Sequence, residues 1–158
     1  MSNFSRSRTR KFLYQMLYAQ SFSKVEDKSF KDAFFSWAFE TNLDEEYLKT
    51  MFNLILENEE FLIETLEKYA PKFDIETMDL SYIIPIFVWV VEMIILKEKI
   101  PAKVSINEAV EIAKFYWDDS ARKIVNWVLN KILDDLELLQ KEIKTFKKKA
   151  NTKTIFRK

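Results

Sequence analysis

Apolar residues recur every three or four positions along most of this chain, and this spacing is what most restricts its fold. One face of an α-helix repeats about every 3.6 residues, whereas a half-buried strand alternates apolar and polar residues. Alternating runs of the strand type are hard to find. The sequence therefore predicts an all-α protein. The helical spacing is clearest near the end, at Ile124, Val125, Val128, Leu129, Ile132, Leu133, Leu136 and Leu139.

Seven helical segments follow from the periodicity and from signals for helix ends. Asn58 is expected to divide the stretch 44–69 into two helices, and Pro71 to end the second. Ser105 and Glu108 have the spacing of a capping box, which predicts that the sixth helix opens there. The other expected segments are 7–22, 29–40, 79–97 and 118–139.

The longest apolar run, 83–96, contains Pro85 and Glu92. A membrane-spanning helix needs about 20 apolar residues, so this run is predicted to be a core helix and no membrane partner is expected. Pro85 predicts a kink or a late start of that helix. An isolated buried carboxylate is very costly, so Glu92 is expected to have a structural partner or to take up a proton.

The residue types that are absent exclude most catalytic sites. The chain has no glycine, no cysteine and no histidine. It therefore lacks a P-loop, a dinucleotide-binding glycine motif, a thiol nucleophile, a histidine base and any zinc site built from cysteine or histidine. We expect a protein that is not an enzyme and that has no cofactor, catalytic residue or metal. The absence of cysteine and of an apolar leader in the opening residues predicts a cytoplasmic protein.

Charge is balanced in total and uneven along the chain. Lys and Arg number 25, as do Asp and Glu. Residues 1–24 carry five basic residues and no acid, and residues 141–158 carry eight basic residues against Glu142. The middle of the chain therefore has an excess of twelve negative charges. This asymmetry is typical of binding to nucleic acid or to an acidic surface, although two solvated ends would give the same pattern.

The first helix combines cations with aromatic rings on one side. At about 100° per residue, its apolar residues fall on one side, and its cations and tyrosines fall on the opposite side. Guanidinium groups can pair with phosphates, and tyrosine rings can stack on unpaired bases, so this side is predicted to bind single-stranded RNA. A solvated basic face with tyrosines at the core margin is the alternative. The predicted RNA-binding residues of this helix are Arg8, Arg10, Lys11, Tyr14 and Tyr18.

Three segments together resemble the NusB family of bacterial transcription antitermination factors. Residues 100–114, I-P-A-K-V-S-I-N-E-A-V-E-I-A-K, closely resemble that family's P-x-K-V-A-I-N-E-A-V-E-L-A-K. Asp119-Ser120 and residues 123–129 are similar to its D-S-x-K-F-V-N-G-V-L. Arg8-Thr9-Arg10 with residues 15–18, Q-M-L-Y, resembles its R-x-A-R and Q-A-L-Y opening. The resemblance covers roughly residues 6–135 and is strongest in the last third.

The resemblance implies a fold of two packed helical bundles, three N-terminal and four C-terminal helices. It also implies binding to boxA-type single-stranded leader RNA together with the small-subunit ribosomal protein NusE, within a transcription elongation complex that holds other Nus factors. By resemblance the RNA surface would include Arg6, Arg8, Arg10 and Tyr18, with Ile124 where the family usually has phenylalanine. A homodimer is possible for the free protein.

Two alternative functions and the role of the C-terminal extension remain open. The chain could be a NusB-like protein-interaction module, or a detached NusB-like domain of the kind that some rRNA cytosine methyltransferases carry. We expect a NusB-like RNA-binding domain over residues 1–137 and a basic C-terminal extension over residues 138–158. The extension could be a phosphate-binding arm or a solubilising end.

Three tryptophans stand where NusB-like sequences often carry glycine. They are Trp89, Trp117 and Trp127. Average usage would give about 11 glycines in a chain of this length, and here there are none. We hypothesise that these positions come from a codon that the source organism reads as glycine, because an indole at a close helix contact would overpack the core.

Overall fold

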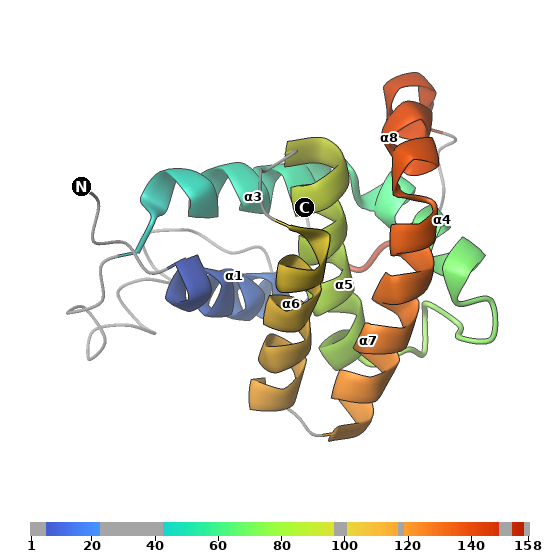
Figure 1. Ribbon diagram of the computed structural model, residues 1–158. Coiled ribbons are helices and arrows are strands. Elements are labelled where there is room, and N and C mark those ends of the chain that lie inside the picture. Colours follow the sequence, from blue (N-terminus) through green and yellow to red (C-terminus); the bar gives the residue numbers. More distant parts are fainter. Residues whose placement is uncertain (1–5, 23–42, 97–100, 117–118, 149–152, 157–158) are drawn as a thin grey trace.

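The computed structural model describes residues 6–22, 43–96, 101–116, 119–148 and 153–156, and within these ranges it is entirely helical and irregular, without a strand. Helices α1 and α3 lie side by side and cross the upright group of α5, α6 and α7 (Figure 1). Helix α8 continues from the end of α7 and packs against the segment that follows α5. The all-α prediction is confirmed, whereas the grouping into three and four helices stays a prediction.

The helices have the following bounds: α1 Arg6–Gln20, α3 Glu45–Glu57, α4 Glu59–Tyr69, α5 Leu80–Val90, the π-helix η1 Val91–Leu96, α6 Ala102–Tyr116, α7 Asp119–Asp134 and α8 Leu136–Thr145. The helix expected over 29–40 lies outside the described residues.

One hydrophobic core joins all of these helices. Leu13 and Leu17 of α1, Met51 of α3 and Ile63 of α4 are each fully buried in it. Helix α5 is buried along nearly its whole length, from Ile83 to Val90, as its almost continuous apolar sequence predicts. The central position of α5 explains why α1, α6 and α7 all pack against it.

The predicted break at Asn58 is confirmed. Helix α3 ends at Glu57 and α4 begins at Glu59. Both the backbone N–H of Asn58 and its side-chain amide donate to the carbonyl of Leu54, the latter at 2.8 Å. Asparagine competes with helical hydrogen bonding in this way, which is why it divides two otherwise continuous apolar patterns.

The predicted capping box at Ser105 is wrong. Helix α6 already begins at Ala102, and the backbone N–H groups of Val104 and Ser105 both donate to the carbonyl of Pro101. Ser105 is therefore inside the first turns, with only 2 % of its surface exposed. Proline suits the start of a helix because its fixed φ is already helical and it needs no intrahelical donor there.

Two further helix boundaries can be compared with the expected ones. Helix α5 begins at Leu80, capped by the Asp79 carboxylate, which accepts from the N–H of Ser81 at 2.9 Å, so Pro85 does not delay its start. The last helix, expected to be continuous, is divided at Asp135. The hydroxyl of Tyr69 donates to the Asp135 carboxylate at 2.7 Å, and this tertiary bond ties the break to the end of α4.

The C-terminal extension packs on the body of the protein. The boundary expected after residue 137 falls inside α8, whose Gln140 amide donates to the carbonyl of Met93 at 3.0 Å. Further on, Phe156 is 1 % exposed, and its ring lies edge-on to Phe87 with 6.3 Å between centroids. The N–H of Ile155 donates to the Glu59 carboxylate at 2.8 Å. Among the extension's described lysines, Lys153 is paired with Glu67 at 2.9 Å.

The tryptophans differ in their surroundings. Trp89 is 1 % exposed, and its indole N–H has no hydrogen-bond partner among the described residues. Leaving a buried donor unsatisfied costs about 1–3 kcal/mol, which supports the hypothesis of glycine at this position. Trp127 is 48 % exposed, with the Lys131 ammonium 4.0 Å from its ring centroid, so the expected overpacking of the core is wrong at this position. Trp117 lies outside the described residues.

The glycine hypothesis predicts a reassigned codon at these three positions in the gene. Reading the genomic codons tests it directly. Ordinary UGG at Trp89, Trp117 and Trp127 would contradict the hypothesis.

The packing of Phe156 predicts that the extension stabilises the fold. We expect Phe156→Ala to lower the free energy of unfolding by about 3–5 kcal/mol, because truncation of a fully buried phenylalanine leaves a cavity against Phe87. Urea denaturation measures the change. Leu138→Ala is the matched control, since Leu138 is 48 % exposed and should change stability by no more than about 0.5 kcal/mol. Equal stability of the two variants would show that the extension contributes nothing.

Candidate nucleic-acid interface

Helix α1 buries a wider face than its sequence indicates. The apolar residues Phe12, Leu13, Met16 and Leu17 point into the core as expected. Thr9, Arg10, Tyr14 and Gln20 are buried as well. The prediction that Arg10 and Tyr14 face solvent is therefore wrong, because the core supplies a partner for the guanidinium group.

That partner is the carboxylate of Glu92. The Arg10 guanidinium donates to both Glu92 oxygens, from Nε at 2.8 Å and from Nη2 at 3.2 Å. The Tyr47 hydroxyl donates to the same carboxylate, and a Glu108 oxygen lies 3.6 Å from Arg10 Nη1. Arg10 is 5 % and Glu92 2 % exposed. The prediction that Glu92 has a structural partner is confirmed, and the network joins α1, α3, η1 and α6.

The electrostatics of this network keep the Arg10 guanidinium charged. Burial alone would lower the pKa of Arg10, but the hydrogen bond and the charge of Glu92 outweigh burial and raise the pKa above its ordinary value. Burial, followed by the negative charge of Glu92, raises the pKa of Tyr47, so its hydroxyl stays protonated and can donate. The network fixes how α1 sits on the core.

The other predicted RNA-binding residues of α1 lie at its surface or margin. Arg8 is exposed. Arg6 is half-buried, with its guanidinium 3.2 Å from the Asp44 carboxylate and 4.0 Å from the centroid of the Tyr47 ring. Lys11 is half-buried, and Tyr18 is half-buried with its ring edge-on to Phe22 at 5.2 Å. These four side chains remain in reach of a ligand.

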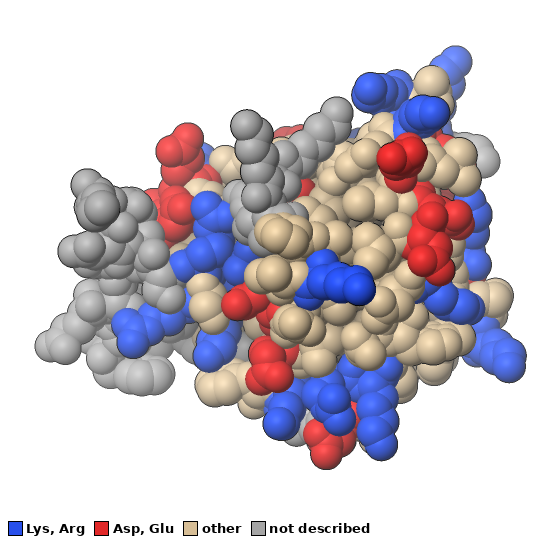
Figure 2. Space-filling model, in the orientation of Figure 1, with Lys and Arg blue, Asp and Glu red and all other residues tan. Residues whose placement is uncertain are grey.

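A second set of residues, which includes the predicted contact Ile124, lies on α7. Ile124 is half-buried and packs against the core, while Lys123 beside it is exposed. The Arg122 guanidinium pairs with Asp119 at 3.3 Å in the first turn. Figure 2 shows cations gathered over α1 and over the lower ends of α6 and α7, with acidic side chains between them. Basic groups from both ends of the region that resembles the NusB family therefore lie on this side of the structure.

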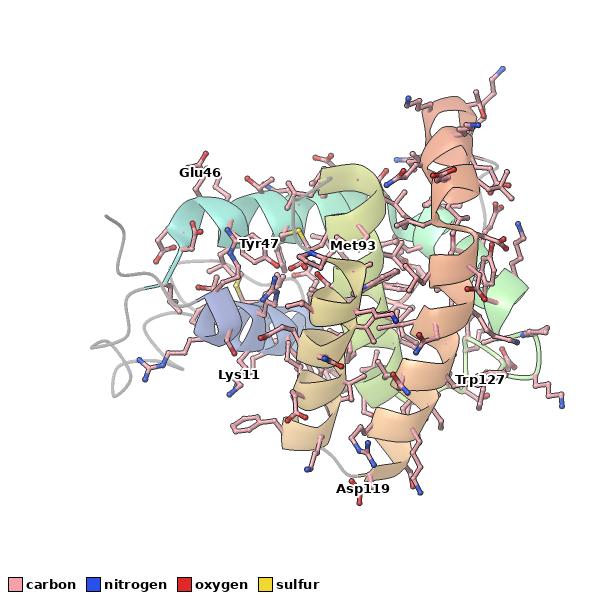
Figure 3. The ribbon with its side chains drawn as sticks, in the orientation of Figure 1. Lys11, Glu46, Tyr47, Met93, Asp119 and Trp127 are labelled. Atoms are coloured by element: carbon pink, nitrogen blue, oxygen red, sulfur yellow. The ribbon has the colours of Figure 1, made fainter. Side chains whose placement is uncertain are left out.

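One of the exposed aromatic residues that were not among the predicted site residues contacts α1. Phe115, near the end of α6, is 63 % exposed, and the Lys11 ammonium lies 4.2 Å from its ring centroid. Figure 3 shows Lys11 on the side of α1 that faces the lower end of α6, with Asp119 at the start of α7 beyond it. The pattern Lys114-Phe115, a cation next to an aromatic ring at a helix end, was the only sequence signal for it.

The described residues contain no group of three or more histidine, cysteine, aspartate or glutamate side chains arranged to hold a metal ion. None of the helices in the described part of the chain is long and apolar enough to cross a membrane.

The buried pair gives a testable prediction. We expect Glu92→Met to lower the free energy of unfolding by about 3–5 kcal/mol, because Arg10 is left charged without its partner. The double variant with Arg10→Met should recover a large part of that loss, since no unpaired charge remains. Urea denaturation of both single variants and the double variant measures the coupling. Strictly additive losses would contradict an energetic link between the two side chains.

Comparison with known proteins identifies the family. The NusB family matches residues 7–134. Relatives named transcription antitermination protein NusB, from Bacillus thuringiensis (strain Al Hakam), Bacillus cereus (strain AH187) and Bacillus anthracis (strain CDC 684 / NRRL 3495), are each 36 % identical over 104 residues, which is 63 % of this chain and 79 % of the relative. No solved structure matches the chain. Because the family match covers well over half of the sequence and spans the helices from α1 to α7, this protein belongs to the NusB family.

Proposed function

We propose that this protein is a cytoplasmic RNA-binding transcription antitermination factor. It binds boxA-type single-stranded leader RNA together with the ribosomal protein NusE and supports rRNA transcription within an elongation complex that contains other Nus factors. Membership of the NusB family and the names of its relatives support this function. The protein acts by binding and positioning, without making or breaking bonds.

The surface of α1 is the structural observation that carries the RNA proposal. Arg8 is exposed, and Lys11 lies beside an exposed aromatic ring. Positive charge binds the phosphates of RNA, and aromatic rings stack on its unpaired bases. Both kinds of group are present on one side of the helix, and Lys123 of α7 extends the positive charge.

We assign the predicted RNA-binding residues two roles according to their burial. Arg6, Arg8, Lys11, Tyr18 and Ile124 are the proposed contacts, since each is exposed or half-buried. Arg10 and Tyr14 are buried behind them and are proposed to hold α1 in place. This assignment reduces the number of cations on the first helix that are available to bind RNA phosphates.

A protein-interaction module is the second candidate. The observation in its favour is that arginines at the start of the chain are paired with acids within the protein, Arg6 with Asp44 and Arg10 with Glu92. Such pairs reduce the charge offered to RNA. A module of this kind would bind NusE and show no RNA affinity of its own or in the complex.

RNA binding is expected to depend on salt through the cations of α1. If about three cations neutralise phosphates, log K should fall with log salt at a slope near −2, so affinity should drop about 20-fold between 50 and 200 mM salt. Arg8→Ala with Lys11→Ala should flatten the slope by more than half. Fluorescence anisotropy with a labelled boxA-type strand, with and without NusE, measures both quantities.

The matched control removes two other exposed lysines. Lys141→Ala with Lys144→Ala changes the charge by the same amount on α8, away from α1, and should leave affinity and slope nearly unchanged. An equal effect of the two double variants would indicate attraction by total charge alone. If the unaltered protein binds NusE and no RNA under any of these conditions, the interaction-module function replaces the proposed one.

A further inference from the structure

The exposed ring of Phe115 is an unusual feature of this surface. Phe115 is near the C-terminal end of α6, and 63 % of its surface is exposed. Ile112 and Ala113, which precede it on α6, pack into the core. Phe115 therefore projects from a helix whose other face is firmly anchored, and its position relative to α1 is fixed by packing.

One cation contacts this ring, and three further exposed cations lie on α1, α6 and α7. The Lys11 ammonium of α1 is 4.2 Å from the ring centroid. Arg8 precedes Lys11 by about one helical turn and is exposed, and Lys114 is exposed next to Phe115. Lys123 of α7 is exposed as well, and Glu111 is the exposed acid on the preceding turn of α6. An exposed aromatic ring with an ammonium group beside it matches a ligand that has both flat rings and negative charges.

We propose that Phe115 is a stacking platform for one unpaired base of the bound RNA, with Lys11 contacting the adjoining phosphate. This inference rests on the proposed function and adds a contact to the same site. Single-stranded RNA supplies the matching chemistry, since each nucleotide joins a planar base to an anionic phosphate. The ring contacts Lys11, one of the proposed contacts of α1, and in the sequence it precedes the proposed contact of α7, Ile124.

The test compares Phe115→Ala with the unaltered full chain by fluorescence anisotropy. The probes are a labelled boxA-type single-stranded RNA and a strand with the same number of phosphates and no bases. Phe115→Ala should weaken RNA binding by about 5- to 100-fold, the range for loss of stacking on one base, with little change in salt slope. It should leave binding to the base-free strand unchanged. Phe115→Trp should bind RNA close to the unaltered value because it keeps an aromatic surface.

Val104→Ala is the matched control. Val104 is an exposed apolar residue, 49 % exposed, at the opposite end of α6, so its truncation should not change RNA binding. Circular dichroism and urea denaturation confirm that each variant is folded. Phe115→Leu keeps apolar area without an aromatic ring, so it separates the two effects. It should bind RNA about as weakly as Phe115→Ala.

The outcomes distinguish this inference from the proposed function. If the unaltered chain binds RNA and Phe115→Ala binds it equally well, the stacking platform is wrong and the proposed function stands. If Phe115→Ala loses affinity equally for the base-free strand, Phe115 acts through Lys11 and not by stacking, which also overturns the inference. If Phe115→Ala weakens only the binding of NusE, the ring is a protein contact. Failure of the unaltered chain to bind RNA removes both.

Discussion

The placement of α1 depends on the buried ion pair between Arg10 and Glu92. Glu92 lies in η1, directly after the most apolar helix of the chain, where a lone carboxylate would be very unfavourable. Two hydrogen bonds from Arg10 and one from Tyr47 compensate for its burial. Because these groups come from α1, α3 and η1, a change in the orientation of α1 would break hydrogen bonds in the interior. The cations on the outer side of α1 are thus presented by a helix that cannot easily rotate.

The sequence was sufficient to predict the helical class, the division at Asn58 and the need of Glu92 for a partner. Each of these follows from a local pattern or from the cost of burying a charge. The sequence was insufficient to predict the burial of Arg10, because a helical projection assigns a charged residue to solvent unless the acid that pairs with it is known. Arg10 and Glu92 are 82 positions apart, and nothing local indicates that they meet.

The errors at helix ends have a similar origin. Ser105 and Glu108 match a capping box, yet Pro101 starts the helix one turn earlier and its carbonyl takes the first donors. At Asp135 the helical pattern of apolar residues continues without interruption, and a tertiary bond from Tyr69 accompanies the break. Phe115 was overlooked because an exposed phenylalanine follows no periodic rule. Its relation to Lys11 is visible only once α1 and α6 are packed together.

Phe156 also has a consequence for how the protein is made. Its ring fills a place beside Phe87, and the neighbouring Ile155 N–H satisfies a carboxylate of α4, so residues almost 100 positions apart complete one part of the core. Contacts of such sequence separation form late, because the loop between them must close first. During synthesis on the ribosome, α4 and α5 would emerge long before Phe156. The nascent chain would therefore carry an unfilled apolar site until translation has passed residue 156, and only then could the protein reach its final stability.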